Sequence, residues 1–462
     1  MSDSARGFAR LDRQVALPLA VVFALGGSLR AAPQDEGAEA SAVQLDAEVL
    51  GALERILTPP ATQAGVDPKL MTKAIVELGP PAIPVLVALL AGEVDAACFV
   101  PGTLEEPVHP LALAERTAIL RAALAGMPRG AVLAHLGQRL DGEPTLDLRL
   151  MLAGMLGDVA DDRAFALLLS ICEGVEPIHL QRSYVQGTLE PALAAHLVRE
   201  PALLGDLEKR AFRVDAAVLG VYARAVGLTH SSRGVELLAG WVGRDPESDA
   251  VVLSQLGRVA GDGGLAVSSA ALGIVRRNAA SSNLQVQRAA LVALGRLRDT
   301  EAFEPLVELL GSGSSLAVSS ARWSLVRICG EDLGGDPQAW SAWRERQLTW
   351  WNEQAPARLE ALHDEEPGIV LQAVAELLRH PLQRHAVAEA IGPLLGHSDE
   401  RIARGACSAL GRLDSSQAVP WLLDALTRAD PELRRLAAQG LARLTGLDLP
   451  PDPLVWTRVL AS

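Results

Sequence analysis

Aromatic side chains gather in one short stretch of the sequence. Eight tryptophans occur in the chain, and four of them are Trp340, Trp343, Trp350 and Trp351. At helical spacing these four rings share one broad face. Tryptophan is enriched in binding surfaces, where its large ring adds contact area to a protein, peptide or sugar. The four tryptophans are therefore the candidate partner-binding residues, and the alternative, which we favour, is that they cover the edge between two repeat blocks.

Two tryptophans stand at the ends of two copies of one sequence element. The eleven residues that end at Trp340 share glycine, leucine and Asp-Pro positions with the eleven that end at Trp456, 116 residues later. Glycine suits a left-handed helix end, aspartate suits an N-cap and proline suits the first helical turn. We predict that Trp340 and Trp456 fold back onto Leu333 and Leu449 and are buried there.

Arginines recur at equivalent points of the sequence, near the end of successive predicted helices. A ladder of guanidinium groups could bind anions or an acidic partner. The alternative, which we favour, is that each cation only stabilises the carbonyl end of its own helix, by about 0.3 to 1 kcal/mol. The arginines of this ladder are Arg258, Arg296, Arg327, Arg412 and Arg443.

Residues for metal binding or catalysis form no recognisable pattern. His380 and His385 are five positions apart, with His397 further on, whereas a helical metal pair uses the i, i+4 spacing. The sequence contains no phosphate loop, no dinucleotide fingerprint and no nucleophile elbow. We therefore predict no catalytic residue, no metal ligand and no cofactor.

Self-comparison shows an internal repeat of about 31 residues. Leu294-Gly295-Arg296-Leu297 recurs as Leu410-Gly411-Arg412-Leu413, again 116 residues later. Within one unit, apolar residues fall at helical spacing on two successive segments. Each unit is therefore predicted to be a pair of helices that buries its apolar faces only by stacking on the next pair.

The repeats resemble the HEAT-repeat family, including the HEAT-like repeats of phycobilisome-lyase type. The pattern Arg-x-x-Ala-x-x-Ala-Leu-Gly-x-Leu, followed by Ala-x-x-x-Leu, fits most of residues 144–170 and 246–446. The resemblance implies an all-α fold, an α-solenoid of antiparallel helix pairs, and a scaffold that binds proteins. By analogy with the lyase-type members, a lyase or hydrolase built on such repeats is the alternative function.

The sequence divides into five segments. Residues 1–31 carry arginines, a short apolar run and small residues, which is the layout of a signal peptide. Residues 32–43 are predicted to be a flexible acidic linker, and 44–245 to be degenerate helical repeats. Residues 246–353 are predicted to be regular repeats ending in the tryptophan-rich helix, and 354–462 to be their duplicate.

Charge and cysteine content limit the function further. The net charge of −14 argues against nucleic-acid binding, because an acidic protein repels phosphate backbones. We expect an exported protein of the bacterial periplasm or cell envelope, with no membrane span unless the leader stays uncleaved. The four cysteines are widely spaced, so we expect buried apolar roles for them, although export would permit a disulfide: Cys98, Cys172, Cys329 and Cys407.

Overall fold

The computed structural model describes residues 46–57, 67–94, 113–142 and 144–461. Throughout these ranges the regular secondary structure is helical, and no strand occurs in them. The predicted signal peptide, the predicted acidic linker and Cys98 lie outside the described residues. The prediction of an all-α fold is confirmed for the part of the chain that the structure describes.

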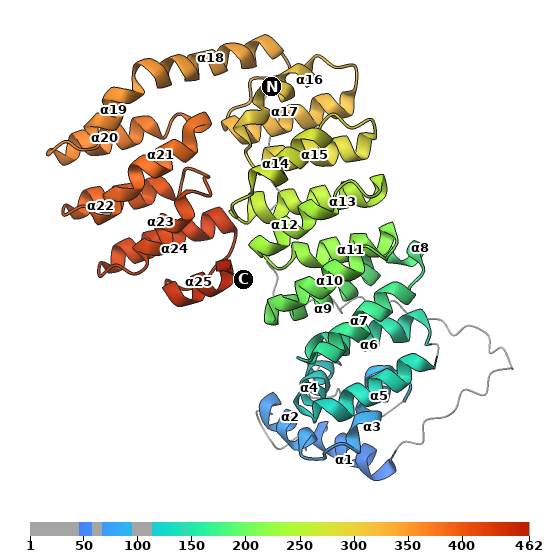
Figure 1. Cartoon of the computed structure of the whole chain (residues 1–462). Helices are drawn as coiled ribbons and strands as arrows, with labels where there is room; N and C mark the ends of the chain where they lie inside the picture. Colours follow the sequence, from blue (N-terminus) through green and yellow to red (C-terminus); the bar gives the residue numbers. More distant parts are fainter. Residues whose placement is uncertain (1–45, 58–66, 95–112, 143, 462) are drawn as a thin grey trace, which may run out of the picture. The chain divides into compact units, whose positions relative to one another are not determined.

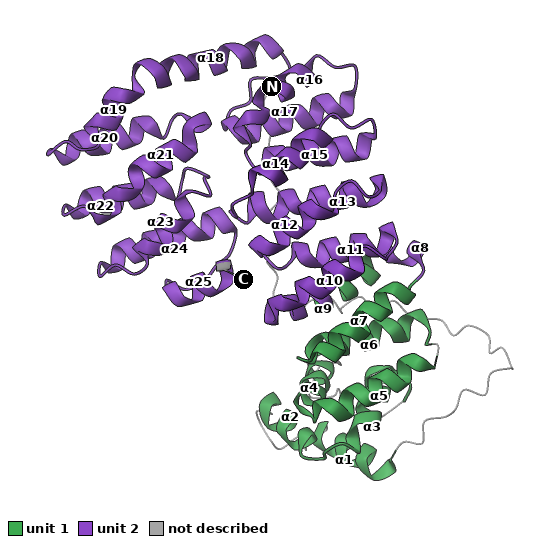
Figure 2. Ribbon diagram, in the orientation of Figure 1, with its two compact units in different colours: residues 1–175, 182–192 green, residues 176–181, 193–462 purple. Residues whose placement is uncertain are grey.

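The chain forms two compact units, coloured separately in Figure 2. Unit 1 comprises residues 1–175 and 182–192, and unit 2 comprises 176–181 and 193–462. This division follows packing. The boundary predicted at residue 245 instead marks where the sequence repeat becomes regular.

Unit 1 is built from short helices whose starts match local sequence signals. Thr145 caps one helix by accepting a hydrogen bond from the Leu148 amide, and Asp161 caps the next through the Arg163 amide. Arg121 and Asp158 form an ion pair of 2.8 Å between two of the helices. Its helices are α1 (Ala47–Leu57), α2 (Pro68–Val76), α3 (Ala82–Leu90), α4 (Leu113–Gly126), α5 (Arg129–Asp141), α6 (Leu146–Asp158), α7 (Asp162–Gly174) and the first part of α9 (Ser183–Arg199).

Unit 2 contains the regular repeats, stacked as antiparallel pairs (Figure 1). The first helices of successive pairs contact one another, as do α13, α15 and α17, and so do α20, α22 and α24 further on. The predicted α-solenoid of helix pairs is confirmed. Besides the end of α9, its helices are α8 (Pro177–Leu180), α10 (Leu204–Ala211), α11 (Ala216–Gly227), α12 (Ser232–Trp241), α13 (Pro246–Leu256), α14 (Ser269–Asn278), α15 (Leu284–Arg296), α16 (Phe303–Leu310), α17 (Ser315–Cys329), α18 (Pro337–Glu353), α19 (Ala355–Ala361), α20 (Pro367–Leu377), α21 (Arg384–Ile391), α22 (Glu400–Leu410), α23 (Ala418–Ala425), α24 (Pro431–Thr445) and α25 (Pro453–Ala461).

The duplication read from the sequence recurs in the helix boundaries. We call residues 246–353 the first block and residues 354–462 the second block. Helices α17 and α24 begin and end 116 residues apart, and both end at a glycine in the left-handed conformation, Gly330 (φ 79°) and Gly446 (φ 70°). Because a side chain is strained at such φ, glycine is the residue that ends each helix with least cost.

The glycine of the Leu-Gly-Arg-Leu motif lies where the first helices of neighbouring pairs approach most closely. A Cβ on Gly295 of α15 would lie 2.7 Å from the Cα of Ser324 in α17. In the second block, a Cβ on Gly411 would lie 2.7 Å from the Cα of Gly440 in α24. The same contact therefore occurs in both blocks, and it requires a residue without a side chain.

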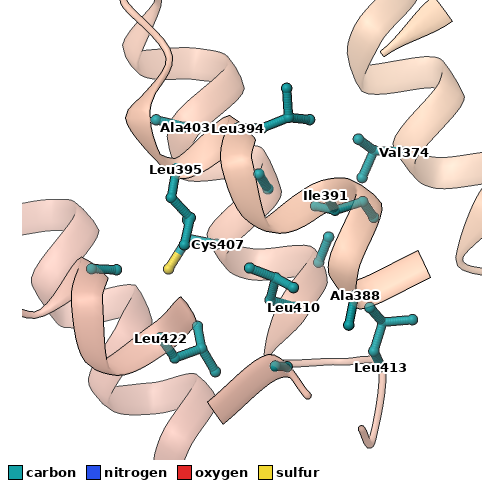
Figure 3. Close-up of a cluster of buried hydrophobic side chains, with 14 of the residues drawn as sticks. Val374, Ala388, Ile391, Leu394, Leu395, Ala403, Cys407, Leu410, Leu413 and Leu422 are labelled. Atoms are coloured by element: carbon teal, nitrogen blue, oxygen red, sulfur yellow. The ribbon is translucent and has the colours of Figure 1, made fainter. Parts of the chain in front are cut away.

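The second block has a continuous apolar core, shown in Figure 3. Ile391, Cys407, Leu410 and Leu422 are among its buried residues, contributed by the three helices α21, α22 and α23. Burial of this kind is the main stabilising contribution, at roughly 25 cal/mol per Å² of apolar surface. Cys172 and Cys329 are buried as well, and burial raises the pKa of the Cys329 and Cys407 thiols to about 12.

Helix α18 passes from the first block to the second, and the second block then lies beside the first within unit 2 (Figure 1). Arg384 at the start of α21 hydrogen-bonds to the Ile328 carbonyl at the end of α17. Gly264 approaches Leu444 so closely that a Cβ there would lie 2.9 Å from the Leu444 carbonyl oxygen. The two blocks therefore meet along a seam that joins residues far apart in sequence.

Among the described residues, no helix is both long enough and apolar enough to cross a membrane.

Candidate functional site

Two equivalent turns face each other across the seam. Arg298 follows α15 and Asp414 follows α22, and both have positive φ, 50° and 51°. Non-glycine residues are uncommon in this region, so both turns are held by their surroundings. The Arg298 Nη2 atom lies 2.9 Å from Asp414 Oδ2, which makes an ion pair between the two blocks.

A second acidic residue of the seam comes from an unusual helical segment. Gly257–Asp262, which follows α13, is a π-helix, a form found frequently at functional sites. Its last residue, Asp262, pairs with Arg296 at 3.4 Å and with Arg327 at 3.3 Å. One carboxylate thus serves two guanidinium groups.

These residues line a cavity of about 620 Å³ between the blocks, which we call the seam cavity. This volume lies in the range of pockets that bind small ligands. Its charged lining comprises four arginines and two aspartates, a surplus of two positive charges in a chain whose net charge is −14. They are Asp262, Arg296, Arg298, Arg327, Asp414 and Arg443.

Arg443 has no acidic partner in the seam cavity. In the described ranges its side chain makes no ion pair or hydrogen bond. It lies in the last turn of α24 and is exposed. Arg327, at the equivalent position of α17, has a buried Nε atom that no hydrogen bond satisfies among the described residues. Arg443 therefore adds an unpaired guanidinium group to the cavity lining, and Arg327 adds one that shares its carboxylate partner with Arg296.

Arg384 reinforces the positive potential beside the cavity. Its side chain is 2% exposed, and its Nε donates to the Pro381 carbonyl at 2.7 Å. Burial, helped by the nearby Arg298 guanidinium, lowers the pKa of Arg384 to about 10, so it stays charged at neutral pH. Burial also lowers the pKa of Arg298, while Asp414 opposes that shift.

A histidine and a serine complete one wall of the cavity. His385 Nδ1 lies 2.8 Å from the Ser415 hydroxyl oxygen, and both residues line the cavity. Burial and the Arg384 charge lower the pKa of His385, which keeps its ring neutral near pH 7. Ser415 is fully buried, and its hydroxyl oxygen also accepts the Gln417 amide at 3.2 Å. These contacts give Ser415 a role in fixing the turn before α23.

The arginine ladder predicted from the sequence is only partly brought together. Arg296, Arg327 and Arg443 line the seam cavity, whereas Arg258 and Arg412 do not. Arg258 donates to Gln255 on its own helix turn, and Arg412 is exposed. Three of the five arginines of the predicted ladder are therefore placed where they could bind one anion together.

Sequence reasoning missed Asp262, Arg298, His385 and Asp414 as residues of the cavity. A signal for two of them was present, because Arg298 and Asp414 occupy the same repeat position with opposite charges. In a duplicated element, a charge reversal at one position indicates that the two copies differ in function or face each other.

The four candidate partner-binding tryptophans all pack internally. Trp340 and Trp343 are 0% and 3% exposed, and Trp343 stacks on Phe303 with ring centroids 5.9 Å apart. Trp350 is half-buried and stacks on His380 at 3.5 Å, and Trp351 is half-buried against the core of the second block. Partner binding by these four tryptophans stays a prediction.

The duplicated tryptophans are buried, as predicted, and their packing onto Leu333 and Leu449 stays a prediction. Trp340 and Trp456 are both fully buried. Each indole N–H donates at 2.9 Å to a carbonyl six residues earlier, that of Gly334 or that of Pro450. The two copies therefore make the same local hydrogen bond.

The three histidines flagged in the sequence lie in separate environments. His380 Nδ1 lies 2.7 Å from Gln347 Oε1, His385 contacts Ser415, and His397 accepts the Asp399 amide at 3.0 Å. Within the described ranges, no three side chains of histidine, cysteine, aspartate or glutamate converge as metal ligands would.

Comparison with known proteins identifies the repeats. The family described as HEAT repeats matches residues 355–442, and the PBS lyase HEAT-like repeat matches 286–312. No curated protein matches the chain.

Among solved structures, yeast importin-beta (Kap95p) is 13% identical, with 86% of this chain and 50% of that chain covered and a TM-score of 0.33. The karyopherin Kap121p bound to the C-terminus of Cdc14p is 14% identical, with 87% and 46% covered and a TM-score of 0.31. An engineered protein is 16% identical, with 86% and 98% covered and a TM-score of 0.21. The chain spans 41% to 56% of the karyopherin chains that it matches.

The matched residues coincide with the helix pairs of unit 2 and with the Leu-Gly-Arg-Leu motifs that hold those pairs together. The resemblance inferred from the sequence is thereby confirmed: residues 286–312 and 355–442 match HEAT repeats, and the described residues form an all-helical fold.

Proposed function

We propose that the chain is a scaffold that binds partner proteins and has no catalysis of its own. The observation that carries this proposal is the seam cavity, whose lining supplies arginine donors. Ser415, the serine beside His385, is fully buried and already hydrogen-bonded, so it is not presented to a substrate. Arginine forks recognise carboxylate and phosphate groups without chemistry on them.

Binding is tested with the full chain in two steps. The purified chain is coupled to beads and exposed to an envelope fraction, and each retained protein is then purified and titrated calorimetrically against the free chain. We expect at least one protein to bind saturably at a fixed ratio. Retained proteins that never saturate, or a retained molecule that the chain converts chemically, would contradict the scaffold function.

Export forms a separate part of the proposal. It is supported by Arg6, Arg10 and Arg13 ahead of the apolar stretch 15–25 and by small residues near Ala31. Removal of residues 1–31 takes away four arginines and two aspartates, which gives the mature chain a net charge of −16.

N-terminal sequencing of the protein from its native cells checks the export proposal. The expected result is a chain that starts near residue 32 in the periplasmic or envelope fraction. An intact Met1 or Ser2 in the cytoplasmic fraction would contradict it.

A further inference from the structure

The charges of the seam cavity leave positive groups uncompensated. Asp262 is shared between Arg296 and Arg327, and Asp414 is taken by Arg298. Arg443 has no acidic partner in the described part of the chain. A cavity with this imbalance favours a negatively charged occupant, because unpaired cations in a partly enclosed space are stabilised by an anion.

Two of the arginines approach the cavity from equivalent positions. Arg327 lies in the last turn of α17 and Arg443 in the last turn of α24, 116 residues apart. The Nε atom of Arg327 is buried without a hydrogen-bond acceptor among the described residues. Because Asp262 is shared with Arg296, the guanidinium group of Arg327 keeps capacity for a further acceptor that enters the cavity.

We propose that the seam cavity binds an oxyanion, a carboxylate or a phosphate group, between Arg327 and Arg443. The planar guanidinium group donates two parallel hydrogen bonds to either kind of oxyanion. The volume of about 620 Å³ holds such a group together with the segment or small molecule that carries it. This proposal deepens the scaffold function and rests on it, since it gives the chemistry by which a partner is recognised.

The existing carboxylates of the cavity predict a change that strengthens binding. Asp262 competes with the ligand for Arg327, from which its carboxylate lies 3.3 Å away. Asp262→Asn removes that competing charge while keeping the shape of the side chain. A purely structural role of these residues would not make the loss of an ion pair improve the affinity for an anion.

Calorimetric titration of the full chain tests the site with three defined probes: hexaglutamate, inorganic phosphate and hexaglutamine. We expect hexaglutamate to bind and hexaglutamine not to bind. In the double variant Arg327→Ala, Arg443→Ala the affinity should fall by about tenfold or more, as expected for loss of charge-assisted hydrogen bonds. Asp262→Asn should raise the affinity. Saturable binding of phosphate alone, with the same losses and gains, would also support the oxyanion site and would assign a free phosphate group as its ligand.

Matched variants separate the site from general effects of charge and folding. Arg412→Ala removes an exposed arginine from the same sequence motif but outside the cavity, and it should leave the affinity unchanged. If the double alanine variant does not fold, the double variant Arg327→Lys, Arg443→Lys takes its place. It keeps the charge but removes the planar fork, so it should bind the anionic probe with intermediate affinity.

Three results would overturn the oxyanion site. They are no binding of either anionic probe, equal losses in Arg412→Ala and the double variant, and weaker binding after Asp262→Asn. A partner protein that binds wild type and double variant equally would refute this site while leaving the scaffold function intact. Absence of any saturable partner would refute the scaffold function whatever the probes show.

Discussion

The buried tryptophans show how much one side chain contributes to these repeats. Trp340 is fully buried, its N–H bonds to the Gly334 carbonyl, and its ring meets Phe303 edge to face with centroids 6.4 Å apart. Truncation leaves a large cavity and an unsatisfied carbonyl. Trp340→Ala should therefore lower the free energy of unfolding by about 3 to 5 kcal/mol, measured by urea denaturation.

The exposed Leu454, at 75% exposure, provides the control for that measurement. Leu454→Ala should leave the urea midpoint nearly unchanged. Trp351→Ala tests partner binding, because the Trp351 ring is only half-buried. Loss of partner capture at an unchanged urea midpoint would support the aromatic surface predicted from the sequence, and a large fall in stability would support a packing role.

His380 makes the stability sensitive to pH. Burial, followed by the charge of Arg379, lowers the pKa of His380 below its ordinary value of 6.5. The unfolded chain therefore binds a proton more readily than the folded one, so the stability is fully present above pH 6.5 and decreases as the pH falls below it. His380→Gln removes the titrating group.

The check is the free energy of unfolding at pH 7.5 and pH 5.5. We expect a smaller loss on acidification in His380→Gln than in the wild type. His363→Gln, a change at an exposed side chain, should lose as much as the wild type. Equal losses in all three proteins would show that His380 does not contribute.

Individual site residues could be predicted from the sequence only in part. Arg296, Arg327 and Arg443 were identified because helix phase places them at the same point of each repeat. Arg298 and Asp414 were not, because their role depends on left-handed turns and on a contact between residues 116 positions apart. Local patterns contain no information about which distant turn will face them.

At the scale of the helix, the motif glycines set how closely the pairs stack. Gly295→Ala would place a Cβ 2.6 Å from the Ser324 hydroxyl oxygen and 2.7 Å from its Cα. Helix α15 would have to move away from α17. The free energy of unfolding should fall by about 1 to 3 kcal/mol, as for other overpacked cores, and thermal or urea denaturation measures it.

Gly240 in α12 is the matched control, since a Cβ there meets nothing within 4 Å. Gly240→Ala should raise the stability by up to about 1 kcal/mol, because alanine favours helix more than glycine does. If both alanine variants gained stability, the close approach of α15 and α17 would not be the reason for the glycine.

Helix ends were predictable from the sequence because their signals are local. Asp336 caps α18 by accepting the Gln338 amide at 3.0 Å, and Gly330 ends α17, as the Gly and Asp-Pro positions indicated. Unit 1 was predicted less well. Outside residues 144–170 its segments depart from the repeat length, so the repeating pattern gives no phase for them.

At the scale of the whole molecule, the return of the second block onto the first could not be foreseen. A repeat pattern specifies contacts between neighbours along the chain. The seam joins residues such as Gly264 and Leu444, which belong to different blocks and do not lie in neighbouring repeats. Only the tertiary structure shows that α18 brings the blocks together.

The ion pair across the seam can be tested by exchanging its charges. Arg298→Asp would place two carboxylates together, and Asp414→Arg would place two guanidinium groups together, so each single variant should lower the melting temperature. The double variant Arg298→Asp, Asp414→Arg should recover most of the loss. Independent, additive losses in a double-mutant cycle would show that the two side chains do not interact.

Arg298 and Asp414 also bear on self-association. Two identical copies that met through this turn as separate chains, related by a two-fold axis, would bring each residue against itself and therefore like charge against like. Fusion in one chain releases that symmetry, because each copy can mutate alone, and here one copy carries Arg and the other Asp. The difference in sign gives each half a preference for its covalently linked counterpart over the same half of another molecule at this turn.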